Sequence, residues 1–217
     1  MLFRSEGVVT HTLDMFADSE LKIVAQIVLP IQQCLMSRVT REHITKLYVH
    51  PQSLAQCRVW LSKKFPHAEI IETSSNARSA ELAARDRKSG AIGGALAAAQ
   101  YGLTVLAQDI QDNSANATRF LVLGRQCPPA TGDDRTSLMF SVVDSVGALH
   151  KALAPFRRYR INMTKIESRP SKRKAWEYYF FVDCDGHQAD RRVARAIEQL
   201  MQHCSFVKVL GSYPNAE

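Results

Sequence analysis

The 217-residue chain lacks the features that mark several large classes of protein. It contains no run of about 18 or more apolar residues, which a membrane-spanning helix requires, so no membrane partner is expected. Its first residues, Met1 to Gly7, have no apolar stretch before a cleavage site, which argues against a secretory signal. These absences predict a cytoplasmic protein.

Cysteine is scarce and scattered. The five cysteines are Cys34, Cys57, Cys127, Cys184 and Cys204. Their number is odd and no two form a C-x-x-C pair, so neither a disulfide framework nor a zinc site is expected. The seven histidines include no helical pair at the spacing of metal ligands. We therefore expect neither a metal nor a cofactor.

The chain also lacks a basic stripe interleaved with aromatic residues, which nucleic-acid binding would require. Its formal net charge is +7, but the basic residues are spread along the sequence. The densest groups, Arg157-Arg158, Lys172-Arg173-Lys174 and Arg191-Arg192, are each typical of a turn or a solvated helix face. No nucleic-acid partner is expected, whereas a modest positive field suits small anionic substrates.

Before about residue 125, short apolar strands alternate with helices. Strands are predicted at Lys22–Leu29, Lys46–Val49, Glu69–Glu72, Thr104–Gln108 and Ala117–Leu123. The first of these is apolar at nearly every position, which predicts a strand buried on both faces. One helix is expected from Pro51 and another over 77–87, capped by Ser74-Ser75-Asn76 and ended by Gly90. Ala91-Ile92 should lead into an alanine-rich helix closed by Gly102, which completes an α/β layer pattern.

Residues 126–135 predict a domain boundary, because paired prolines, a glycine and acids occur there without periodicity. The elements predicted beyond it are a strand at 137–143, a helix at 147–156, strands at 161–166 and 176–182 joined by a turn at 170–174, a helix lined by Val193, Ile197, Leu200, Met201 and Cys204, and a strand at 206–210. The order βαββαβ is the ferredoxin-like arrangement. Many unrelated functions use that fold, so the fold alone does not indicate one.

Specific motifs carry a resemblance. Thr164 to Pro170 reads Thr-Lys-Ile-Glu-Ser-Arg-Pro and is preceded by Gly147-Ala148-Leu149-His150, which resembles the ACT domain of prephenate dehydratases. The closing Leu210-Gly211-Ser212-Tyr213-Pro214 matches the family's ending. Three upstream segments, Asn116–Gly124 with Thr118-Arg119-Phe120, His50–Cys57 and Ser74–Ala77, are similar to motifs of the same enzymes. The resemblance runs in order from Ser5 to Ala216 and is closest to bifunctional chorismate mutase–prephenate dehydratases.

This resemblance implies an α/β fold in two domains. Residues 1–125 would be part of a periplasmic-binding-protein-like catalytic domain, 126–135 a linker, and 136–217 a ferredoxin-like ACT regulatory domain. In the family the catalytic domain opens with a glycine-rich stretch and reaches a Glu-Asn-Ser motif before the point that matches Ser5. We therefore expect an N-terminally truncated catalytic domain.

The resemblance also implies an activity, that of a carbon–oxygen lyase in L-phenylalanine biosynthesis. It would convert prephenate to phenylpyruvate, water and carbon dioxide, and L-phenylalanine would inhibit it. Thr118 would be catalytic, and the residues implied to bind substrate are His50, Gln52, Asn76, Arg119 and Phe120. The phenylalanine site would lie between paired ACT domains, in a homodimer or higher homo-oligomer, and would be formed by Gly147, Ala148, Leu149, Glu167, Ser168 and Arg169.

Simple chemistry constrains these roles. A threonine hydroxyl is too weak an acid to ionise, so Thr118 would donate a hydrogen bond or a proton to the leaving oxygen. Arg119 could bind a carboxylate at two points, although strand alternation places it on the face opposite Thr118 and Phe120. Gly147 would let the backbone approach the ligand. An alternative remains open, in which the chain is an inactive remnant that binds L-phenylalanine and dimerises.

Overall fold

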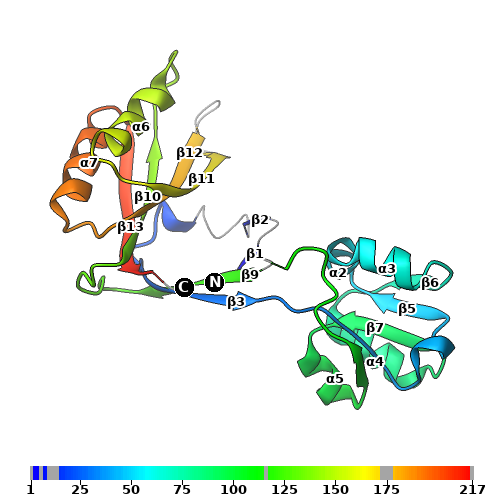
Figure 1. Cartoon of the computed structure of the whole chain (residues 1–217). Coiled ribbons are helices and arrows are strands. Elements are labelled where there is room, and N and C mark those ends of the chain that lie inside the picture. Colours follow the sequence, from blue (N-terminus) through cyan, green and yellow to red (C-terminus); the bar gives the residue numbers. More distant parts are fainter. Residues whose placement is uncertain (1, 5–6, 9–14, 115–116, 172–177, 216–217) are drawn as a thin grey trace. The chain divides into compact units, whose positions relative to one another are not determined.

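A computed structural model of the chain describes every residue except 1, 5–6, 9–14, 115–116, 172–177 and 216–217 (Figure 1). Several residues named above therefore lie outside the described part of the chain: Ser5, Asn116, Ala216 and the basic group at 172–174. The turn predicted at 170–174 is described only at its first two residues. No helix in the described part of the chain is both long and apolar enough to cross a membrane.

The chain forms two compact units, which are described separately. Unit 1 consists of Met1–Leu29 together with Thr118–Glu217, and unit 2 consists of Pro30–Ala117. Unit 2 is therefore an insertion in the sequence of unit 1. The division predicted from the sequence, into 1–125, 126–135 and 136–217, follows the order of the family motifs and not these compact units. It stays a proposal about the domains.

Unit 2 is built on a mixed five-stranded sheet in the order β6-β5-β7-β4-β8. Its strands are β4 (Cys34–Ser37), β5 (Lys46–Val49), β6 (Glu69–Glu72), β7 (Ser89–Gly93) and β8 (Thr104–Ala107), and its helices are η1 (Arg41–His43), α2 (Pro51–Gln56), α3 (Arg58–Lys64), α4 (Asn76–Arg85) and α5 (Ala95–Tyr101). Strand β5 runs parallel to β6 and β7, whereas β4 is antiparallel to β7 and β8. The α/β prediction is confirmed.

Several local predictions in unit 2 are also confirmed. Strands β5 and β6 have the predicted bounds. The Ser75 hydroxyl accepts a hydrogen bond from the backbone N–H of Arg78 at 3.1 Å and caps α4. Helix α5 ends at Gly102, whose left-handed φ of 64° suits glycine. Each of these features depends on residues close together in the sequence.

The prediction for the segment around Gly90 is wrong. Helix α4 ends at Arg85, and Gly90 lies inside strand β7. A Cβ at Gly90 would lie 3.2 Å from side-chain carbons of Ile44, Leu35 and Leu47, so glycine is needed there for packing. Ala91 and Ile92 precede the predicted alanine-rich helix, α5, but they form the fully buried middle of strand β7, which was not predicted.

Unit 1 contains two four-stranded sheets. The first has the order β2-β1-β9-β3 and the second β11-β12-β10-β13. The first comprises β1 (Leu2–Arg4), β2 (Gly7–Val8), β3 (Lys22–Pro30) and β9 (Ala117–Gly124). The second, here called the ACT sheet, belongs to a βαββαβ run of β10 (Asp134–Ser141), α6 (Ala148–Arg158), β11 (Met163–Pro170), β12 (Tyr178–Asp185), α7 (Arg191–Met201) and β13 (Phe206–Pro214). The predicted ferredoxin-like order is confirmed.

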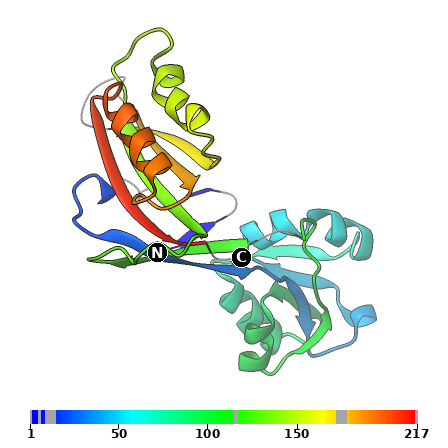
Figure 2. The ribbon, with the colours of Figure 1, turned by 60° about the vertical axis from the view of Figure 1, so that its left-hand side comes forward.

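The two faces of the ACT sheet pack against different parts of unit 1. Helices α6 and α7 cover one face, here called the helix face (Figure 1, Figure 2). Their core includes Leu138, Phe140 and Val182 from the sheet. The opposite face packs against Phe16, Ile23 of β3 and Leu121 of β9, with Met139 and Phe181 from the sheet; these residues form what we call the inner core.

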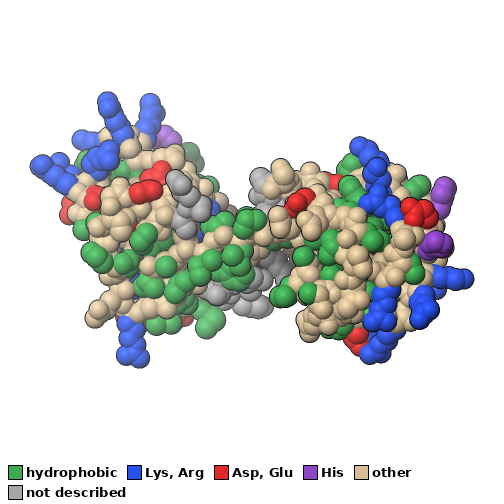
Figure 3. Space-filling view, turned by 60° about the horizontal axis from the view of Figure 1, so that its bottom comes forward, with side chains coloured by type: hydrophobic (Ala, Val, Ile, Leu, Met, Phe, Trp, Pro, Cys, Tyr) green, Lys and Arg blue, Asp and Glu red, His purple; other side chains and the backbone are tan. Residues whose placement is uncertain are grey.

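Two burial predictions in unit 1 are wrong. Strand β3 is not buried on both faces, because Ile23 is buried whereas Ile27 and Leu29 are 50% and 51% exposed. Strand β3 lies at the edge of its sheet, and although Ile23, Ile27 and Leu29 share one face of it, only Ile23 belongs to the inner core. Hydrophobic side chains are visible on the surface of this unit in Figure 3. In α7, Met201 is likewise 51% exposed, outside the buried stripe.

Residues 15–23 pack against β13, through hydrogen bonds from a lysine side chain and through a close approach of the two backbones. Lys208 Nζ donates to the carbonyl oxygens of Phe16 and Ser19, both at 2.8 Å, and to that of Ala17 at 3.2 Å. A Cβ at Gly211 would overlap the carbonyl oxygen of Ile23 and lie 2.8 Å from its backbone nitrogen. The glycine therefore allows β13 to pass directly against β3.

Candidate functional site

Three predicted substrate-binding residues lie together in unit 2. His50 follows β5 and caps α2, its Nδ1 accepting from the backbone N–H of Gln52 at 3.3 Å. This contact places the ring proton on Nε2 when the imidazole is neutral. Asn76 begins α4 after β6, and its Oδ1 accepts from the Ser53 hydroxyl at 2.8 Å. Because β5 and β6 are parallel, both helices start at the carboxyl edge of the sheet, where ligands of open α/β sheets bind.

A third helix start lies at this edge, and it belongs to the predicted alanine-rich helix, whose place at the site was missed from the sequence. Strand β7 is also parallel to β5 and ends at Gly93, and Gly94 caps α5. A Cβ at Gly93 would lie 3.3 Å from Cβ of Asn76, so the glycine allows close packing against that residue. The Gly-Gly pair before an alanine-rich helix was the available signal. Backbone N–H groups at helix starts favour anions, which suits a carboxylate-bearing ligand.

The Thr118-Arg119-Phe120 motif lies on β9 in unit 1. Thr118 is 7% exposed. Leu121 reaches the inner core, and Arg119, which shares its face, reaches the ACT sheet. This arrangement agrees with the predicted alternation of Arg119 against Thr118 and Phe120.

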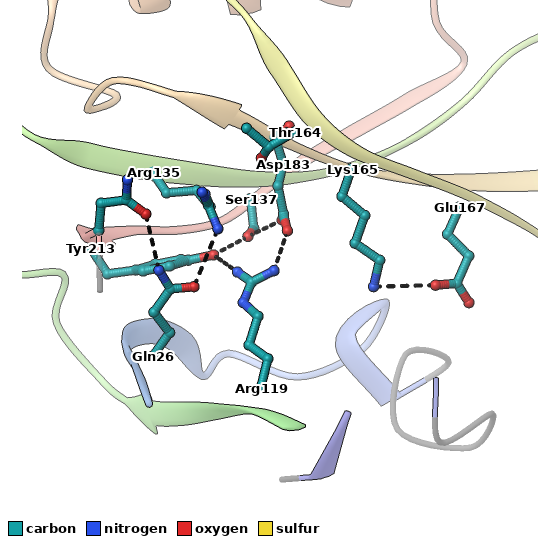
Figure 4. Close-up of polar contacts among 10 residues, drawn as sticks. Gln26, Arg119, Arg135, Ser137, Thr164, Lys165, Glu167, Asp183 and Tyr213 are labelled. Carbon is teal, nitrogen blue, oxygen red and sulfur yellow. Dashed lines mark hydrogen bonds and ion pairs between the residues drawn. The ribbon is translucent and has the colours of Figure 1, made fainter. Parts of the chain in front are cut away.

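The carboxylate bound to Arg119 in the structure belongs to the protein. Arg119 Nη1 forms an ion pair with Asp183 Oδ2 at 2.5 Å, and Nη2 donates to the Tyr213 hydroxyl at 2.5 Å (Figure 4). Ser137 Oγ donates to Asp183 Oδ1 at 2.5 Å and lies 2.6 Å from the Tyr213 hydroxyl oxygen. We call these four residues the Arg119 cluster. The predicted role of Arg119 in binding substrate stays a prediction.

Burial and charge shape the protonation of this cluster. Burial alone lowers the pKa of the Arg119 guanidinium, but Asp183 and Tyr213 outweigh it, so the pKa is raised and the group stays charged. Burial, and then the negative charge of Asp183, raise the pKa of Tyr213 to about 12. The cluster therefore contains a permanent cation and a neutral phenol at physiological pH.

The predicted effector residues of α6 lie at its N-terminus. Gly147 caps the helix with a left-handed φ of 77°, and Ala148 and Leu149 form its first turn. A Cβ at Gly147 would meet nothing within 4 Å, so its backbone conformation is what calls for glycine in this structure. Leu149 packs against the core beneath the helices.

Glu167, Ser168 and Arg169 lie inside β11, which continues to Pro170, beyond the end of the strand predicted at 161–166. Cross-strand partners share a face of a sheet. Ser168 pairs with Phe180, which packs on the helix face. Glu167 and Arg169 pair with Phe181 and Tyr179, which belong to the inner core. The strand therefore presents Ser168 to one side and Glu167 and Arg169 to the other.

The helix face also has an open pocket of about 560 Å³ beside Ser168's strand. It is lined by His150, Leu153, Arg157, Asn162 and Met163 among others. His150 directly follows the Gly-Ala-Leu motif, and Asn162 and Met163 precede the Glu-Ser-Arg motif, so neighbouring sequence was the signal for these residues. Among the described residues, no group of three His, Cys, Asp or Glu side chains could hold a metal ion.

Comparison with known proteins places both regions of the chain. The family model described as prephenate dehydratase matches residues 4–128, and the ACT domain model matches residues 136–200. The chain is 49% identical over 212 residues to a bifunctional chorismate mutase/prephenate dehydratase of Aquifex aeolicus (strain VF5). That match covers 97% of this chain and 59% of the relative, so the chain spans about three fifths of that protein's length.

Two further proteins are similar over most of their own length. A prephenate dehydratase of Lactococcus lactis subsp. cremoris (strain MG1363) is 36% identical over 217 residues, which cover 96% of this chain and 78% of the relative. The crystal structure of a prephenate dehydratase from Arthrobacter aurescens in complex with L-Phe is 37% identical, with a TM-score of 0.85. It covers 97% of this chain and 72% of that one.

Proposed function

This chain belongs to the prephenate dehydratase family, and from that premise we propose that it converts prephenate to phenylpyruvate, water and carbon dioxide under inhibition by L-phenylalanine. The observation that carries the proposal is the gathering of His50, Gln52 and Asn76 at one sheet edge, within the segment that matches the family. The L-Phe complex of the Arthrobacter aurescens protein, which is similar along 97% of this chain, supports the effector.

The reaction requires no covalent bond between the substrate and the protein. Loss of the ring carboxylate as carbon dioxide supplies an electron pair to the ring, and the ring hydroxyl departs with one proton as water. Because aromatisation drives the step, the enzyme needs to hold the ring and assist departure of the oxygen. In our proposal Thr118 donates its hydroxyl hydrogen bond to the leaving oxygen. His50, Gln52 and Asn76 bind a substrate carboxylate through N–H donors.

Replacing the Thr118 hydroxyl tests this proposal. Thr118→Val keeps the side-chain shape and should lower the rate of phenylpyruvate formation by about 100-fold or more, since a positioned proton donor contributes that much. Thr118→Ser should retain part of the activity because it keeps the hydroxyl. Thr104→Val, at an exposed strand threonine of β8, is the matched control and should leave the rate unchanged.

The outcomes separate the proposal from its alternative. Equal rates for Thr118→Val and the wild type, with both folded by circular dichroism, would contradict the catalytic role. A folded wild-type chain that binds L-phenylalanine without forming phenylpyruvate would support the inactive remnant instead. We further propose that two ACT domains pair around the effector and that the protein works in the cytoplasm.

A further inference from the structure

The Arg119 cluster connects the strand of Thr118 to the ACT sheet. We propose that Asp183 and Tyr213 are positioning residues for catalysis: they hold Arg119 and thereby fix β9, the strand on which Thr118 lies. The inference rests on the proposed function for its kinetic consequence, but its structural part can be tested without any turnover. It also assigns Arg119 to the protein's own carboxylate instead of the substrate's.

Three strands of the ACT sheet converge on one guanidinium. Asp183 of β12 and Tyr213 of β13 both bind the single Arg119 side chain of β9 (Figure 4). Ser137 of β10 contacts Asp183 and Tyr213 in turn. Asp183 uses one oxygen for Arg119 and the other for Ser137. The contact is therefore geometrically fixed at both ends, unlike an ion pair between two flexible side chains.

Burial strengthens the ion pair between Arg119 and Asp183. The side chains of Arg119 and Asp183 are 21% and 10% exposed, and Tyr213 is fully buried. Solvent and salt screen such a pair much less than an exposed one. Removing one member of a buried pair leaves the other charge without compensation, which is strongly unfavourable. If Arg119 turned its Nη1 from Asp183 to a substrate carboxylate, it would leave Asp183 in that state.

The location of Arg119 makes it suited to position Thr118. The two residues are adjacent, so a shift of the backbone at Arg119 moves the catalytic hydroxyl. Small displacements of a reacting group cost large factors in rate. Asp183 is also the cross-strand partner of Lys165 on β11, which forms an ion pair with Glu167 at 3.3 Å. The strand that presents Ser168 is thus the direct neighbour of the strand that holds Arg119.

Hydrogen exchange tests whether Asp183 holds β9. In Asp183→Asn, peptides covering 117–124 should exchange their amide protons about tenfold faster or more, because a hydrogen bond to a charged group is lost as a restraint. Asp185→Asn is the matched control: it lies two residues along β12, and its carboxylate accepts from Asn162 outside the cluster. Its exchange over 117–124 should equal that of the wild type.

Tyr213→Phe provides a second route if Asp183→Asn fails to fold, because it keeps the buried ring and removes only the hydroxyl that Arg119 contacts. Its exchange over 117–124 should also rise. Unchanged exchange over 117–124 in each folded variant would overturn the proposal. These measurements need no substrate, so they decide the structural claim even if the wild type forms no phenylpyruvate.

Kinetics distinguish a positioning role from a substrate contact. In Asp183→Asn and Tyr213→Phe we expect kcat to fall about tenfold while KM for prephenate stays within about threefold, since alignment and not binding is lost. Arg119→Gln combined with Asp183→Asn should be no worse than the more damaging single change, as for residues that act as a unit. A raised KM in Arg119→Gln, with Asp183→Asn silent, would show Arg119 to be a substrate ligand and overturn the proposal.

Discussion

At Gly211 the backbone of β13 crosses directly against Ile23 of β3, with no room for a side chain. We predict that Gly211→Ala lowers the free energy of unfolding of unit 1 by about 2–3 kcal/mol, because the two backbones must separate and disturb the inner core. Gly94→Ala is the control, since a Cβ there meets nothing within 4 Å. It should cost no more than about 1 kcal/mol as a change of helix cap. Urea unfolding followed by circular dichroism measures both, and equal effects would contradict this reading.

Tyr213 leads to a prediction about alkaline pH. Its pKa is raised from about 10 to about 12 by burial and by Asp183, so the folded state retains a proton that the unfolded state releases. The contribution of the Tyr213 proton to the free energy of unfolding is fully present below pH 10 and is lost as the pH rises toward 12. The free energy of unfolding of the wild type should fall over this window by roughly 2–3 kcal/mol more than that of Tyr213→Phe. Parallel curves for the two proteins would contradict the raised pKa.

The sequence indicated Arg119 as a functional residue but not its partners. Strand alternation around Arg119 could be predicted, because it depends on consecutive residues of β9. Asp183 and Tyr213 are 64 and 94 residues away. Asp183 follows a predicted strand and Tyr213 lies in the closing motif 210–214, and the local pattern of neither segment indicates a contact with Arg119. A contact of this kind depends on how two sheets pack, and no residue near Arg119 encodes that.

Among the elements, local signals explain which predictions succeeded. Strands β5 and β6 are short apolar runs bounded by helix caps, and the caps at Ser75 and Gly102 act on their own neighbours. Strand β7 reads Ser-Gly-Ala-Ile-Gly, which has weak strand propensity and resembles a helix end. It is a strand because β4 and β5 flank it and bury it completely, and that tertiary context is absent from the local sequence.

The two faces of β11 lead to a prediction about the effector. Ser168→Val should weaken L-phenylalanine binding about tenfold or more, because Ser168 faces the helix side with Gly147, Ala148 and Leu149 on the adjoining helix. Glu167→Gln tests the expectation that Glu167 also binds the effector: because its side chain faces the inner core, the affinity should instead stay within about twofold. Calorimetry measures affinity, and sedimentation shows whether binding and pairing strengthen each other by the same factor. The opposite ranking of the two variants would place the effector on the other face.

On the scale of the whole molecule, the insertion of unit 2 leads to a further prediction. The chain leaves unit 1 on β3 and returns on β9, and these strands are neighbours in one sheet, with Val24 against Gly124. A chain in which 30–117 is replaced by a turn of about four residues should therefore fold. It should keep its circular dichroism spectrum for unit 1 and bind L-phenylalanine with unchanged affinity, but form no phenylpyruvate. An unfolded or aggregated product would show that unit 1 depends on the insertion.

The order of segments was predictable at this scale, whereas the composition of the units was not. The paired prolines of the linker and the βαββαβ pattern are local features; the βαββαβ order is confirmed, whereas the boundary predicted at 126–135 stays a proposal. The attachment of residues 15–29 to β13 rests on contacts such as that of Lys22 with Val209 and of Gln26 with Asn215. These join residues 187 and 189 positions apart, beyond the reach of any periodicity.

The same attachment sets an order of events during synthesis on the ribosome. Unit 2 can fold once residue 117 has left the exit tunnel, because all its strands have then been made. Residues 15–29 must wait for Lys208, Val209 and Asn215, which are translated only after the whole of unit 2. During that interval Ile23 and its apolar neighbours remain without their final partners, in a nascent chain that already carries a folded unit. Strand β3 is thus made before unit 2 but completes its packing only after β13 has been made.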